Sequence, residues 1–123
     1  MDSATLLWWF AGDPRLGDGA REAIEDPSTE AFVSVASAWE ISIKHATGKL
    51  TLDVPVTEIL DAGLMLDLPV VMHDVLSAAR LPMHHRDPFD RILVAQALHG
   101  GMVLVTPDRA LRAYDVPVMD ARA

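Results

Sequence analysis

The stretch HHRDPFDRILVAQALHGGMVLVT, residues 84–106, places a helix and a strand in direct succession. Asp87 suits the cap of a helix, and Pro88 suits its first position. An apolar helical segment follows and ends at a pair of glycines. MVLVT, residues 102–106, is short and rich in β-branched residues, as in a buried strand. The stretch therefore predicts one helix–strand unit of an α/β sheet.

Helix and strand patterns alternate along the rest of the chain in the same way. Further strands are predicted at 31–35, 69–72 and 116–120, the last at an edge. A parallel sheet with helices on both faces follows from this alternation. Asp2 resembles the end of a strand before a helix, yet one residue precedes it, so we expect a truncated first strand. The predicted helices cover residues 4–11, 18–26, 36–50, 54–68, 73–81, 88–99 and 107–114.

Composition narrows the class of protein. The chain has 123 residues, half of them hydrophobic, which fits one globular domain over residues 1–123. It has no cysteine, no run of apolar residues long enough for a membrane span and no signal-peptide pattern, so we expect a cytoplasmic protein. The formal net charge of −8 argues against a general nucleic-acid coat. It does not exclude a nuclease, because the carboxylates of a metal site lower the formal net charge and the bound metal ion is not counted in it.

Four acidic residues are predicted near helix starts: Asp2, Glu40, Asp90 and Asp108. Each has a structural explanation, since Asp and Glu favour the positive end of a helix. Asp2 and Asp108 suit caps, and Glu40 completes the capping-box pattern SAWE at 37–40. Considered singly, none of the four requires a functional role.

Their shared location gives a second interpretation of the same acids. Glu40 and Asp108 follow predicted strands closely, and Asp2 would follow the first strand. Such positions gather at the carboxyl edge of a parallel sheet, where folds of this class bind ligands. Clustered carboxylates repel one another unless a cation or protons are present, and oxygen ligands of this kind select Mg²⁺ or Mn²⁺. The sequence therefore predicts a divalent metal site.

Four motifs, DSATLLWW, SAWEISIK, HRDPFDRILVAQA and LVTPDRALRAY, resemble those of PIN-domain ribonucleases, specifically VapC-type toxins of type II toxin–antitoxin pairs. The motifs occur in family order over nearly the whole chain. The resemblance implies a three-layer α/β/α fold with a parallel sheet of order 3-2-1-4-5. It also implies Mg²⁺- or Mn²⁺-dependent cleavage of RNA, a VapB-like antitoxin as partner, and a homodimer.

The resemblance also implies roles for individual residues. The family's four metal-binding, catalytic acids fall on Asp2, Glu40, Asp90 and Asp108. Thr106 falls on a hydroxyl that orients an acid, and Asp87 on a helix cap or outer acid. Arg86 and Arg91 are close enough to the motif to contact phosphate, with a solvated surface position as the equal alternative. His84 and His85 precede the helix and are expected mainly at the surface.

Two other functions fit parts of the pattern. A degenerate, non-catalytic PIN domain would still bind an antitoxin, although the presence of all four acids argues against it. A phosphoacceptor receiver domain also has a parallel sheet and an acidic Mg²⁺ site. That domain needs a lysine near the end of its last strand, whereas the final lysine here is Lys49.

Overall fold

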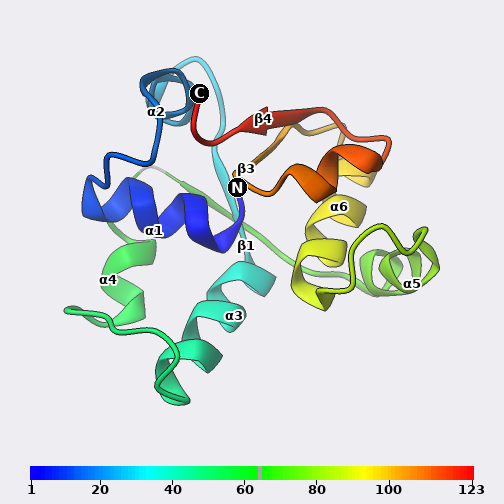
Figure 1. Ribbon diagram of the computed structural model, residues 1–123, viewed down its shortest axis with the longest axis horizontal. Helices are drawn as coiled ribbons and strands as arrows, with labels where there is room; N and C mark the ends of the chain where they lie inside the picture. Colours follow the sequence, from blue (N-terminus) through cyan, green and yellow to red (C-terminus); the bar gives the residue numbers. More distant parts are fainter. Residues whose placement is uncertain (64) are drawn as a thin grey trace.

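The computed structural model describes residues 1–63 and 65–123 (Figure 1). No helix within these residues is long and apolar enough to cross a membrane. Helices and short strands alternate along the chain, as the sequence predicts. The elements are α1 (Ser3–Ala11), α2 (Asp18–Glu25), β1 (Phe32–Ser34), α3 (Val35–Ala46), α4 (Val56–Leu60), β2 (Leu66–Leu68), α5 (Met72–Arg80), α6 (Pro88–Gly100), β3 (Leu104–Thr106), the 3₁₀ helix η1 (Arg109–Ala113) and β4 (Val118–Asp120).

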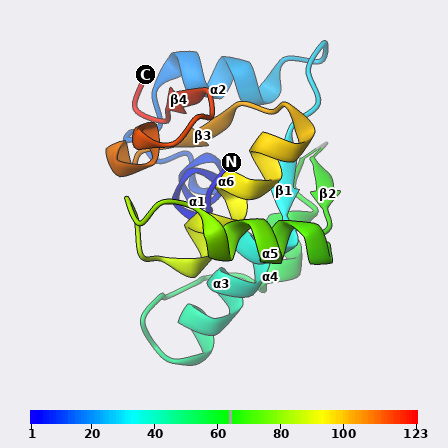
Figure 2. The same ribbon diagram turned by 90° about the vertical axis from the view of Figure 1, so that its right-hand side faces the viewer.

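The strands form two parallel pairs, and the N-terminus lies between them. β1 pairs with β2, side by side in Figure 2, and β3 pairs with β4. The amino group of Met1 donates to the carbonyl of Phe32 in β1 (3.3 Å), and the amide of Asp2 donates to the carbonyl of Val105 in β3 (3.1 Å). Residues 1 and 2 thus occupy the place of a central strand. With that place counted as strand 1, the arrangement agrees with the expected order 3-2-1-4-5, but the described strands form two two-stranded sheets instead of one continuous sheet.

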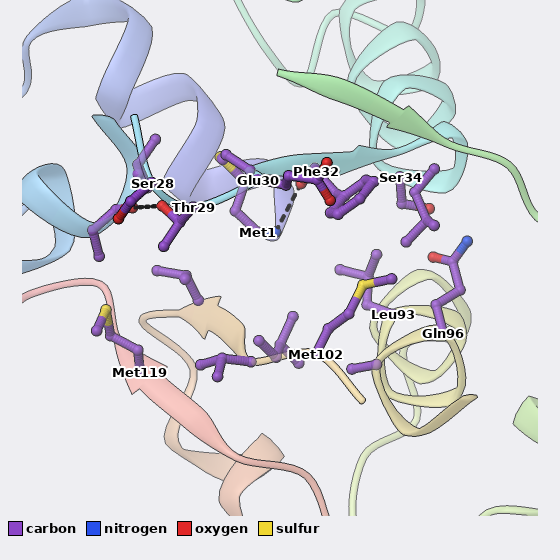
Figure 3. A pocket seen from close by; sticks show the side chains of 18 residues that line it. Met1, Ser28, Thr29, Glu30, Phe32, Ser34, Leu93, Gln96, Met102 and Met119 are labelled. Carbon is purple, nitrogen blue, oxygen red and sulfur yellow. Dashed lines mark hydrogen bonds between the residues drawn. The ribbon is translucent and has the colours of Figure 1, made fainter. Parts of the chain in front are cut away.

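A cavity of about 800 Å³ extends from Met1 between the two strand pairs (Figure 3). Strand residues such as Phe32 and Leu104 line it, together with Leu93 and Gln96 of α6. We call this cavity the central slot. Its walls are mostly apolar, and the edges of β1 and β3 that face it carry backbone groups of the kind that pair with another strand.

Helices cover both faces of the β3–β4 pair. Leu104 and Val118, which are opposite one another in the register, pack against α6. Val105 and Met119, the next opposed pair, pack against α1 and α2. Because neighbouring side chains of a strand point to opposite faces, this pattern defines the three layers of the fold.

The structure corrects the sequence prediction in the middle of the chain. The helix predicted over 54–68 ends at Leu60, and the strand lies at Leu66–Leu68 rather than at 69–72. Residue 64, within that predicted helix, lies outside the described residues. Pro69 has no amide hydrogen to donate to a ladder, so the strand ends before it. The helix predicted over 107–114 is the short 3₁₀ helix η1.

Candidate active site

Helix starts position three of the four predicted acids. Asp2 is the cap of α1, where its carboxylate accepts the amide of Thr5. Asp108 caps η1 and accepts the amide of Ala110. Asp90 is the third residue of α6, and Asp87 caps that helix. The capping roles predicted for Asp2, Asp87 and Asp108 are therefore confirmed. Capping fixes the carboxylates in place.

Glu40 reaches the site from a different position than the sequence indicates. The predicted capping box at 37–40 is wrong, because Ser34 caps α3 and the helix already begins at Val35. Glu40 therefore lies in the second turn. Its buried carboxylate accepts the hydroxyl of Ser3 and pairs with Lys44 (3.1 Å), and these contacts hold it beside the start of α1.

Thr106 joins two of the acids at the end of β3. Its hydroxyl donates to Oδ2 of Asp2 (2.6 Å) and accepts the amide of Asp108 (3.1 Å). Thr5 donates its hydroxyl to the other oxygen of Asp2 (2.7 Å). The expected orienting hydroxyl is thus present, and it orients Asp2. Although Asp2 is next to the N-terminus, it is buried and held by several hydrogen bonds.

The four acids meet in one concavity of about 220 Å³. It lies where the starts of α1, α6 and η1 approach the side of α3. Among the described residues that line it, Lys44 is the one with a basic side chain. The wall is formed by Asp2, Ser3, Ala4, Glu40, Lys44, Asp87, Asp90, Pro107 and Asp108.

The electrostatics of the concavity are dominated by negative charge. Burial and, to a smaller extent, the charges of Asp87, Asp2 and Glu40 together raise the pKa of Asp90 to about 7, partly opposed by His85. A carboxyl group with such a pKa is in an environment that favours a proton or another positive charge. This donor set of carboxylates fits a hard divalent cation.

His85 also lies in the acidic cluster, although the sequence interpretation did not select it. Its Nε2 lies 2.7 Å from Oδ2 of Asp108 and 3.4 Å from Oδ2 of Asp90. One ligand atom from each of these three residues lies within 4.8 Å of the others. The neighbouring His84 instead stacks edge-on against Tyr114. Sequence alone offered a pair of histidines beside a capped helix, without a signal to distinguish them.

Arg91 is in neither of the two expected environments. It is 6% exposed, so it is not at a solvated surface, and its guanidinium points into the protein rather than toward the site. It donates to the carbonyls of Ala78, Leu81, Pro82 and His85 at 2.7 to 3.1 Å. The side chain thus joins the end of α5 to the loop before α6. Arg86, in contrast, is exposed.

We expect Arg91→Met to lower the free energy of unfolding by about 3 kcal/mol, because it leaves buried carbonyls without a donor. Arg86→Met is the matched control and should change it by less than about 0.5 kcal/mol. Urea unfolding of both variants in the presence of a chelator measures the difference. Equal stability of the two variants would contradict a structural role for Arg91.

Comparison with known proteins agrees with the geometry of the site. Residues 1–117 match the PIN domain family. The chain is 32% identical over 120 residues to Ribonuclease VapC22 of Mycobacterium tuberculosis (strain ATCC 25618 / H37Rv), an alignment that covers 95% of this chain and 92% of that protein. No solved structure matches. The chain therefore belongs to the PIN domain family and is a VapC-type member of it.

Proposed function

We propose that the chain is a ribonuclease toxin of a type II toxin–antitoxin pair, which hydrolyses RNA phosphodiester bonds with Mg²⁺ or Mn²⁺. The observation that carries the proposal is the convergence of Asp2, Glu40, Asp90 and Asp108 on one small concavity. A non-catalytic binding module would have no need for this arrangement. The proposal also includes a cytoplasmic location, which agrees with an RNA substrate.

In this proposal the four acids hold the ion, directly or through water. A bound divalent ion lowers the pKa of water and offsets charge on a phosphoryl group. Thr106 and Thr5 fix the orientation of Asp2, and the amide of Ala110 fixes Asp108. Lys44 is half exposed and carries the positive charge closest to Glu40, so it is positioned to attract a phosphate.

The metal-free site disfavours a negative charge on Asp90. Burial and the charges of neighbouring carboxylates raise the pKa of this group to about 7. A cation removes this repulsion and leaves the carboxylate ionised. Protonation of the Asp90 carboxyl group therefore competes with metal binding.

Removal of divalent ions tests the function. We expect a chelator to stop RNA cleavage by the purified protein, and added Mg²⁺ or Mn²⁺ to restore it. Glu40→Gln should lower the cleavage rate at least about a hundredfold, because it removes one of the negative ligands. Gel analysis of labelled RNA measures both effects. Cleavage that persists in the chelator, with Glu40→Gln equally active, would contradict the proposal.

The proposal includes a VapB-like antitoxin and a homodimer. Apolar side chains that would suit such contacts are exposed on α5, where Met72 is 73% and Leu76 53% exposed, and on α3, where Trp39 is 61% exposed. Surfaces of this kind mark protein–protein contacts more often than isolated apolar residues do. Light scattering with and without antitoxin measures the assembly, and a monomeric mass in both samples would contradict it.

A further inference from the structure

The imidazole of His85 makes hydrogen bonds at both of its ring nitrogens. Nδ1 lies 3.0 Å from the backbone nitrogen of Asp87, which donates to it. Nε2 lies 2.7 Å from Oδ2 of Asp108, with Oδ2 of Asp90 at 3.4 Å. The ring is only partly exposed and bridges the cap of α6 and the cap of η1.

These two contacts determine which nitrogen carries the proton. A backbone amide of Asp87 can only donate, so Nδ1 must present its lone pair and carry no hydrogen. The proton of the ring is then on Nε2, which donates to Asp108 and lies close to Asp90. A nitrogen that carries a proton has no free lone pair for a metal. The contacts therefore make His85 a hydrogen-bond donor within the acidic cluster and not a metal ligand.

The loop that carries His85 is held at its backbone as well. The amide of His85 donates to the hydroxyl of Tyr114 (3.0 Å), and its carbonyl accepts from Arg91 (3.1 Å). The hydroxyl of Tyr114 donates to the carbonyl of Pro82 (2.8 Å). With the main chain fixed on both sides, the ring has little freedom to turn away from Asp108.

We propose that His85 is a positioning residue, whose Nε2–H holds the carboxylates of Asp108 and Asp90 in place for the cation. The inference rests on the proposed function and assigns to His85 a role that none of the four acids has. Asp108 accepts from Ala110 at Oδ1 and from His85 at Oδ2, so both of its oxygens are oriented. Partners of metal ligands typically change affinity by about 10- to 100-fold when they are removed.

Nuclear magnetic resonance of protein labelled with ¹⁵N at histidine tests the proton position directly. Long-range ¹H–¹⁵N correlation should show a protonated Nε2 and an unprotonated Nδ1 for His85, both without metal and with Mg²⁺. The spectrum of His85→Gln identifies the signals of this ring. A proton on Nδ1, in either state, would overturn the proposal, and its appearance with Mg²⁺ would identify His85 as a ligand.

Metal affinity separates positioning from a general structural role. Electron paramagnetic resonance of Mn²⁺ titrations should show about tenfold weaker binding to His85→Leu, which has no donor. His85→Gln keeps a donor near the position of Nε2 and should bind within roughly threefold of the wild type, as should the control His84→Leu. Unchanged binding to His85→Leu, or an equal loss in His85→Gln, would overturn the proposal. If the wild-type protein binds no Mn²⁺, the metal site of the proposed function is wrong, and the resonance experiment alone decides the role of His85.

Discussion

Asp90→Asn is expected to remove RNA cleavage and, in metal-free protein above about pH 7, to stabilise the fold. The two effects have one cause. Asp90 is largely buried, and this burial together with the charges of neighbouring carboxylates raises its pKa to about 7. In the proposed function its negative charge helps to hold a cation, and the same charge is repelled by neighbouring carboxylates when no cation is bound. Asparagine keeps the size of the side chain and removes the charge at every pH.

The sign of the stability effect follows from proton linkage. The pKa of Asp90 is raised from 3.8 to about 7 on folding, so the folded state binds this proton more tightly than the unfolded state. Wild-type stability is therefore highest at pH values below the pKa of Asp90 in the unfolded chain, 3.8, and it falls as the pH rises toward about 7. Because Asp90 is partly exposed and solvent screens its charge, the free energy of unfolding falls by a reduced amount, on the order of 2 kcal/mol. The asparagine variant lacks this part of the pH dependence.

Two measurements on the same variant check the prediction. The cleavage rate should fall about a thousandfold, because the ion loses an anionic ligand. Urea unfolding in a chelator at several pH values should show a flatter pH profile than that of the wild type. Asp115→Asn, at an exposed position, is the matched control and should change neither quantity. A fully active Asp90→Asn protein, free of host nucleases, would refute the assignment of Asp90.

The sequence predicted the parts of the site that depend on local chemistry. Asp87 followed by Pro88 and an apolar helical segment favours a helix start, and Asp90 then lies in the first turn. Glu40 was assigned to the site although its predicted capping role is wrong. Its location depends on the side of α3 that faces α1, and the direct link is the hydroxyl of Ser3.

The parts that the sequence did not predict depend on contacts between distant residues. His84 and His85 are identical in type and adjacent, and their roles differ because Tyr114 and Arg91 fix the loop around the second one. Residues 66–68 continue an apolar pattern with helical spacing, yet they form β2 because β1 offers a partner strand. Pairing between strands takes precedence over a weak local preference in such short segments.

The second large effect concerns the central slot. We expect a variant with about four apolar, β-branched residues added before Met1 to be more stable by about 3 kcal/mol, which corresponds to roughly 10 °C in Tm. The added segment would run between β1 and β3, where residues 1 and 2 already pair with both strands. Thermal unfolding followed by circular dichroism measures the change.

Three features of the slot favour a strand over any other filling. The amino group of Met1 is buried, and desolvation lowers its pKa despite the nearby Asp2, so replacing it with a peptide amide removes a buried charge. The slot has an apolar lining and lies between two strand edges, which a strand satisfies with side chains and backbone together. Among the described residues, Oε1 of the buried Gln96 in its wall has no hydrogen-bond partner, and a donor in the slot would supply one.

A matched extension separates strand formation from the mere addition of residues. About four glycine and serine residues in the same place supply the backbone amides but none of the apolar side chains, so the gain should fall below about 1 kcal/mol. Since helices cover both faces of the sheet, one lysine at the middle of the apolar segment should also remove most of the gain. Equal Tm values for the apolar and the glycine–serine variants would show that the added residues do not enter the slot. A gain confined to the apolar variant would mean that the added residues form a strand between the two strand pairs. This strand would join the pairs into one sheet and lead into Asp2 at the acidic site.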